Sequence, residues 1–158
     1  MGAGKIFCIL GGILTLLATY FFSFMPSIPG TYYYGLGFFL NIYSIFTSEW
    51  ILYIVIAVVF IIFLLAGIFI ILGVKSRKLA LFGSIFVLGF GVYMILAFYA
   101  FGLSSDISIF MRQFLYSALI DGIIPFDLFL GPFSLGTYLL IGGGVLGLIG
   151  GIKGTSLF

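Results

Sequence analysis

The sequence predicts an all-α integral membrane protein with four transmembrane helices and an extra interfacial helix in its second outer loop. Of its 158 residues, 64% are hydrophobic and only 6% are charged, whereas about a quarter of a typical soluble domain is charged. The chain also contains four apolar stretches close to the roughly 20 residues that a helix needs to cross a bilayer. These stretches lack the alternation of a membrane β-barrel strand, and a helix satisfies its own backbone hydrogen bonds within lipid.

The four apolar stretches are expected to pack as one domain that occupies residues 1–158 in a tetraspan layout. The spans are placed at residues 6–24, 50–73, 79–101 and 133–152. No Asp, Glu, Lys or Arg interrupts any of them. Because a charge in the middle of a spanning helix is costly, this pattern supports all four assignments.

Five of the six basic residues lie on one side of this layout, which predicts its orientation. They precede the first span, fill the short turn between the second and third spans, and follow the fourth: Lys5, Lys75, Arg77, Lys78 and Lys153. Cytoplasmic loops carry the excess of Lys and Arg, so both termini are expected in the cytoplasm and the two longer loops outside. Lys75, Arg77 and Lys78 are also expected to lie near anionic lipid head groups.

The first outer loop, residues 25–49, is unusually apolar. After two helix-breaking prolines it continues with Tyr32, Tyr33 and Tyr34. Tyrosine is favoured where one end of a side chain is wet and the other end is apolar. We therefore expect this loop either to lie along the outer membrane interface or against a partner, or to fold onto its own bundle. The sequence leaves these alternatives open.

The second outer loop is expected to contain a helix over residues 106–121 that lies flat in the membrane interface. Ser105 can cap the start of this helix, and Gly122, which directly follows residue 121, can end it. Its apolar face includes Phe110 and Phe114, which are therefore expected at the outer interface. The rival interpretation, a fifth span, would place Arg112 near the middle of the membrane and is disfavoured.

Glycines in the fourth span indicate close helix packing. Gly143, Gly147 and Gly151 recur at every fourth residue, so they are expected to form one smooth face against which another backbone packs. The first span has a weaker version of this pattern at Gly11 and Thr15. These five residues are predicted to mediate packing between the first and fourth spans. Contact with another subunit through the same face is the alternative.

The residues that most active-site and cofactor chemistry requires are missing. The chain has no His and one Cys, which excludes intrachain disulfides, zinc fingers, His-ligated haem and Ser-His or Cys-His nucleophiles. Its four carboxylates all fall outside the spans, and Asp127 is expected to be a solvated turn residue. No catalytic, cofactor-binding or metal-binding residue is therefore predicted. The net charge of +2 is too small for nucleic-acid binding.

These observations predict a protein that acts through contacts and is not an enzyme. The favoured function is a non-catalytic accessory or structural subunit of a larger membrane protein complex. The expected partners are membrane lipids, together with other membrane subunits or copies of the chain itself. A self-assembling tetraspan scaffold or adhesion-type membrane protein is the first alternative, and a small pore or uncoupled carrier is the second.

Overall fold

The computed structural model describes residues 2–25, 30–47, 51–96 and 115–154. Its long helices are α1 (Ala3–Phe21), α3 (Ile51–Leu72), α4 (Arg77–Ile95) and α6 (Leu135–Ile152). Each of them is long and apolar enough to cross a membrane. The prediction of four membrane-length helices is therefore confirmed.

Hydrogen bonds that cannot be read from hydropathy mark the end of α1 and the start of α6. α1 ends at Phe21, and its carbonyl accepts a hydrogen bond from the amide of Phe126 at 2.7 Å. The backbone of the next residue, Phe22, is already extended. α6 begins after Ser134, whose hydroxyl accepts a hydrogen bond from the Thr137 amide at 3.2 Å and so caps the first turn.

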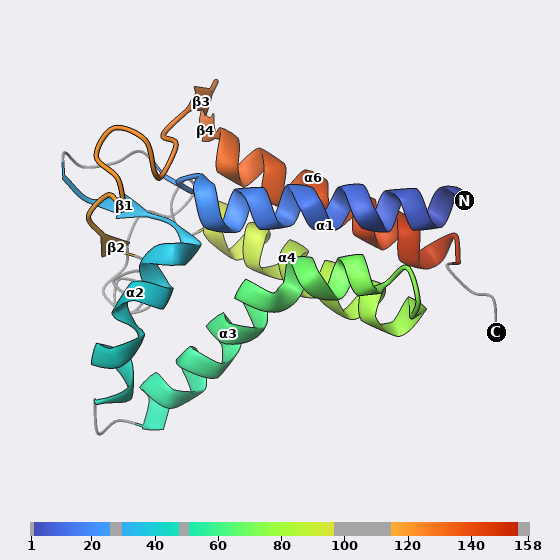
Figure 1. Ribbon diagram of the computed structural model, residues 1–158, viewed down its shortest axis with the longest axis horizontal. Helices are drawn as coiled ribbons and strands as arrows, with labels where there is room; N and C mark the ends of the chain where they lie inside the picture. The colour runs from blue at the N-terminus through green and yellow to red at the C-terminus, as the bar shows by residue number, and fades with distance from the viewer. Residues whose placement is uncertain (1, 26–29, 48–50, 97–114, 155–158) are drawn as a thin grey trace.

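The four long helices form a bundle in which α1 and α4 each pack against both α3 and α6. Consecutive long helices run in opposite directions, so the start of α1, the α3–α4 turn and the end of α6 lie together (Figure 1). We call this the basic end, because it carries Lys5, Lys75, Arg77, Lys78 and Lys153. The opposite end, which carries the short strands and α2, is called the loop end.

The loop end contains a helix that the sequence did not predict. α2 (Gly35–Phe46) follows strand β1 (Tyr32–Tyr33) and packs against α3. β1 pairs in antiparallel register with β2 (Leu115–Tyr116), which places Tyr32 opposite Tyr116. The two segments that were expected to form separate outer loops are therefore paired with each other.

Two tyrosines of the first outer loop point into the protein, although Tyr43 of the same loop is exposed. Tyr33 and Tyr34 are both buried, and the Tyr34 hydroxyl donates a hydrogen bond to the Ser117 carbonyl at 3.2 Å. The Asn41 side-chain amide donates another to the Leu115 carbonyl at 2.6 Å. Of the alternatives weighed for this loop, these contacts correspond to a loop folded onto its own bundle.

The expected interfacial helix is only partly covered by the described residues. Residues 106–114, which include Phe110 and Phe114, lie outside them. The remainder is not helical, because β2 takes its place and a turn follows, so the predicted helix end at residue 121 is wrong. The backbone groups of β2 pair with β1 instead of with a preceding helical turn. Gly122, expected to end the helix, closes that turn with a φ of +74°.

A short hairpin connects this region to α6. β3 (Phe129–Leu130) pairs with β4 (Phe133–Ser134) in antiparallel fashion. Gly131 lies between the two strands with a φ of +68°, a backbone conformation that glycine adopts without strain. The hairpin delivers Ser134 to the position where it caps α6.

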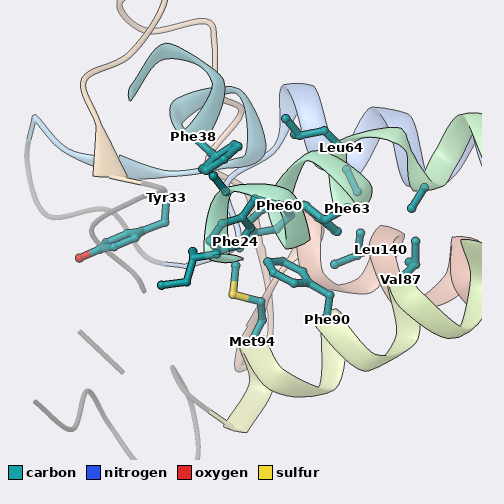
Figure 2. Close-up of a cluster of buried hydrophobic side chains, with 14 of the residues drawn as sticks. Phe24, Tyr33, Phe38, Phe60, Phe63, Leu64, Val87, Phe90, Met94 and Leu140 are labelled. Atoms are coloured by element: carbon teal, nitrogen blue, oxygen red, sulfur yellow. The ribbon is translucent and has the colours of Figure 1, made fainter. Parts of the chain in front are cut away.

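Aromatic side chains fill the bundle where it meets the loop end (Figure 2). Phe63 of α3 stacks on Phe90 of α4, with ring centroids 3.8 Å apart. Phe24 meets Phe63 edge to face at 6.2 Å, and Phe38 of α2 packs on Phe60 at 4.8 Å. All five side chains are buried. The rings therefore connect α3 to α2, to α4 and to the segment after α1.

Candidate functional site

The helices α1 and α6 are in direct backbone contact. A Cβ atom on Gly11 would lie only 2.6 Å from the carbonyl oxygen of Gly143 and 2.6 Å from the amide nitrogen of Gly147. Near the basic end, a Cβ on Gly4 would lie 3.1 Å from the carbonyl oxygen of Gly150. The two backbones therefore touch, and side chains larger than hydrogen would push the helices apart.

The glycines of α6 divide between two neighbouring helices. Gly143 and Gly150 face α1, where a Cβ on Gly150 would lie 2.7 Å from the Cys8 sulfur. Gly147 and Gly151 point instead toward α4, where they meet the side chains of Ser84 and Leu81. The expectation of one face formed by Gly143, Gly147 and Gly151 is therefore corrected.

The helical repeat explains this division. Each step of four residues turns about 40° beyond a full turn of an α-helix, so two such steps rotate a side chain from one neighbour toward the next. A step of seven residues drifts by only about 20°. The glycines on the α1 side follow this seven-residue spacing, at Gly136, Gly143 and Gly150.

Buried hydroxyls next to these glycines are satisfied within their own helices. Thr15 donates to the Gly11 carbonyl at 2.8 Å, and Ser84 donates to the Ala80 carbonyl at 2.6 Å. Thr137 differs, since its hydroxyl donates to the Phe24 carbonyl at 3.1 Å and ties α6 to the segment after α1. The hydroxyls thus stabilise contacts between helices without adding unpaired polar atoms.

The basic end carries the residues expected to set orientation. Lys75, Arg77 and Lys78 are all exposed in and after the α3–α4 turn. Lys153 lies over the ring of Phe7, with its ammonium nitrogen 5.3 Å from the ring centroid. This contact links the end of α6 to the start of α1.

The loop end presents a run of exposed apolar side chains that we call the loop-end patch. Its members are between 40% and 58% exposed: Leu119, Ile120, Ile123, Phe126, Leu128, Phe129 and Leu130. The run lies on the segment between β2 and β4, beyond the ends of α1 and α6 (Figure 1). Leu119 and Ile120 fall within the helix expected over residues 106–121, and no role was predicted for the other five residues.

Hydrogen bonds to the end of α1 hold this segment in place. The Ser23 amide donates to the Phe126 carbonyl at 3.1 Å, in a parallel bridge between Phe22 and Phe126. The Ser23 hydroxyl also donates to a carboxylate oxygen of Asp127 at 2.7 Å. Asp127 is half-buried and anchors the segment, which corrects the expectation of a solvated turn residue. It also lines a small pocket of about 260 Å³ beside Tyr32.

A second and larger hollow lies between α3 and α4. This apolar groove has a volume of about 550 Å³, and its lining includes Phe60, Gly89, Phe90 and Tyr93. The sequence did not predict this groove, because the distance between two helices is not visible in either segment. The one available signal was Gly89, a side-chain gap four residues before Tyr93.

The described residues contain no cluster of three His, Cys, Asp or Glu side chains that could hold a metal ion. Cys8 is fully buried against α6, where it acts as a small packing residue. Comparisons with protein-family models, with curated proteins and with solved structures found no match.

Proposed function

We propose that this chain is a non-catalytic structural subunit of a larger membrane complex. In this proposal its four long helices cross the bilayer, its basic end faces the cytoplasm, and the loop-end patch binds a neighbouring membrane protein. The observation that carries the proposal is the patch itself, seven apolar side chains exposed on a segment that Ser23 and Asp127 hold in place.

An apolar patch of this kind favours a partner. Covering apolar surface contributes about 25 cal/mol per Å², and contiguous exposed patches on proteins commonly mark interaction sites. The segment is already ordered by its bonds to Phe21 and Ser23. Binding therefore does not have to meet the entropic cost of ordering the loop.

The glycine faces of the helices support the same assignment, because other helices of this chain already cover them. Gly11, Gly143 and Gly147 are covered by neighbouring helices within the chain. These faces are therefore not free to bind a neighbouring protein. Among the described residues, the loop-end patch is the densest run of exposed apolar side chains outside the long helices. The stacked rings of Phe63 and Phe90 fill the bundle near the same end, which favours contact over solute passage.

The test compares two triple variants that remove the same kinds of side chain. The patch variant carries Ile123→Ala, Leu128→Ala and Leu130→Ala, and the control variant carries Ile6→Ala, Leu10→Ala and Leu17→Ala on the exposed face of α1. Each is purified from its native membrane in mild detergent, and the mass of the intact assembly is measured.

We expect the wild-type chain and the control variant to purify in a stoichiometric complex with another protein. The patch variant is expected to purify as the lone chain with an unchanged circular dichroism spectrum. A lone chain for the wild type, or equal loss of the complex in both variants, would contradict the proposal. An assembly made only of copies of this chain would favour the self-assembling scaffold instead.

A further inference from the structure

The groove between α3 and α4 has the shape and lining of a ligand site. Its volume of about 550 Å³ lies within the range of small-molecule pockets. Phe60 and Phe90 are buried at its floor, while Leu52, Val55 and Ile85 are exposed at its rim. In a chain that crosses the bilayer, such a rim faces lipid.

Gly89 keeps the groove open. A Cβ atom on this residue would meet no described atom within 4 Å. The neighbouring glycine Gly83 behaves differently, since a Cβ there would lie 2.8 Å from the Ala66 carbonyl oxygen of α3. The two helices therefore touch at Gly83, toward the basic end, and leave unfilled space at Gly89.

Tyr93 is one of the residues that line this apolar groove, and it carries a polar atom. Its hydroxyl oxygen is buried and has no hydrogen-bond partner among the described residues. Buried tyrosine hydroxyls usually find a partner, as the Tyr20 hydroxyl does on the Leu64 carbonyl at 3.1 Å. One residue of the groove lining thus carries a covered donor that lacks an acceptor among the described residues.

The position of Tyr93 along α4 indicates which acceptor fits. It lies 16 residues after Arg77 in the sequence, or about 24 Å along the helix axis. The hydrocarbon core of a bilayer is about 30 Å thick, so Tyr93 reaches the level just inside the far interface when Arg77 lies at the near one. Lipid ester groups are found at that boundary.

We propose that the groove binds one fatty acyl chain of a glycerolipid from the leaflet at the loop end. The ester carbonyl accepts a hydrogen bond from Tyr93 after rotation of that side chain brings its covered hydroxyl to the groove surface. A partner helix fits these features less well, because its backbone carbonyls are already paired within the helix. This inference rests on the proposed membrane crossing but not on the proposed partner. The two therefore fail separately, since the test below uses the purified chain alone.

The test uses photo-crosslinking in a defined bilayer. The purified full chain is placed in phosphatidylcholine nanodiscs that contain a trace of phosphatidylcholine with a diazirine in one acyl chain. After illumination, labelled residues are mapped by mass spectrometry. We expect labels to concentrate on the groove residues of α3 and α4 over the equally exposed Ile6 and Leu10 of α1. Uniform labelling of all lipid-facing residues would overturn the proposal.

A matched pair of glycine variants tests occupancy. Gly89→Leu fills the groove, and its Cβ atom would have no described atom within 4 Å. Gly142→Leu makes the same change at a position on α6 where a Cβ atom would also have no neighbour within 4 Å. We expect Gly89→Leu to lower groove labelling by about tenfold or more, because it removes the contact area of several methylene groups. Gly142→Leu is expected to leave it unchanged. Equal labelling in the two variants would refute the assignment.

Tyr93→Phe tests the hydrogen bond. The variant keeps the ring and removes only the hydroxyl, so loss of one hydrogen bond is expected to weaken retention of the ester lipid about fivefold. An ether-linked probe lacks the carbonyl and is expected to bind the wild type and Tyr93→Phe equally. Unchanged retention of the ester lipid in Tyr93→Phe would show that the hydroxyl does not hold the chain.

Discussion

Gly11 of α1 and Gly143 of α6 bring their two helices into backbone contact, because a Cβ on Gly11 would lie 2.6 Å from the Gly143 carbonyl oxygen. Lipid offers no hydrophobic drive for helix association, so this close approach supplies dispersion contact that larger side chains would prevent. The contact lies near the middle of α1 and orders the antiparallel pair around which α3 and α4 pack.

Replacing Gly11 with Leu is expected to destabilise the bundle. The added side chain cannot fit between the two backbones, and overpacking of this kind costs about 1–3 kcal/mol or more. Gly142→Leu is the control, because its Cβ meets no described atom. Thermal unfolding in detergent, followed by circular dichroism, should give a clearly lower midpoint for Gly11→Leu only. Equal midpoints in the two variants would show that the close contact does not limit stability.

The Ser23–Asp127 hydrogen bond is expected to anchor the loop-end patch. In a double-mutant cycle of Ser23→Ala and Asp127→Ala, we expect a coupling energy of about 1 kcal/mol, since the 2.7 Å bond joins a hydroxyl to a half-buried carboxylate. Hydrogen exchange of the Phe126 amide should also accelerate in Ser23→Ala. A coupling energy near zero would mean that the backbone bridge alone holds the segment.

The orientation of the protein can be tested with single cysteines. Lys75→Cys at the basic end and Ile123→Cys at the loop end are both exposed positions, whereas the native Cys8 is buried and serves as the unreactive control. A membrane-impermeant maleimide on intact cells is expected to label Ile123→Cys. Lys75→Cys is expected to react only after permeabilisation. The reverse pattern would invert the proposed topology.

Alkaline pH is expected to loosen the loop end. Burial raises the pKa of the Tyr34 phenol, the nearby Tyr116 raises it further, and a hydrogen bond with the Leu119 backbone lowers it in part. The folded protein therefore keeps a proton that the unfolded chain loses near pH 10, so the stability from neutral Tyr34 falls as pH rises from there through the folded pKa.

Tyr34→Phe isolates this contribution, because the variant has no phenol to ionise at that position. Between pH 9 and pH 11, the thermal midpoint of the wild type should fall more steeply than that of Tyr34→Phe. Parallel curves would show that Tyr34 ionisation does not affect folding. At neutral pH the variant should be less stable by about 1 kcal/mol, because it lacks the hydroxyl that donates a hydrogen bond to the Ser117 carbonyl.

The long helices were predictable because their signal is local. Span length and the lack of internal charge are properties of each segment alone, and the structure places α3 at Ile51–Leu72 against an expected 50–73. The gathering of basic residues at one end follows from the alternation of helix direction. α2 was not predictable in the same way, because its twelve residues are too few to span a bilayer and one of its partners, β2, is distant in sequence.

The sequence by itself determined the membrane-like composition, the four long helices and the presence of small residues for close packing. Only the tertiary structure decided which glycine faces which helix, since Gly143 meets α1 and Gly151 meets α4 through rotation around one helix axis. It also decided the pairing of β1 with β2 and the opening beside Gly89. These features depend on the distance between two helices and on contacts between segments that are far apart in the sequence. Neither can be read from one segment alone.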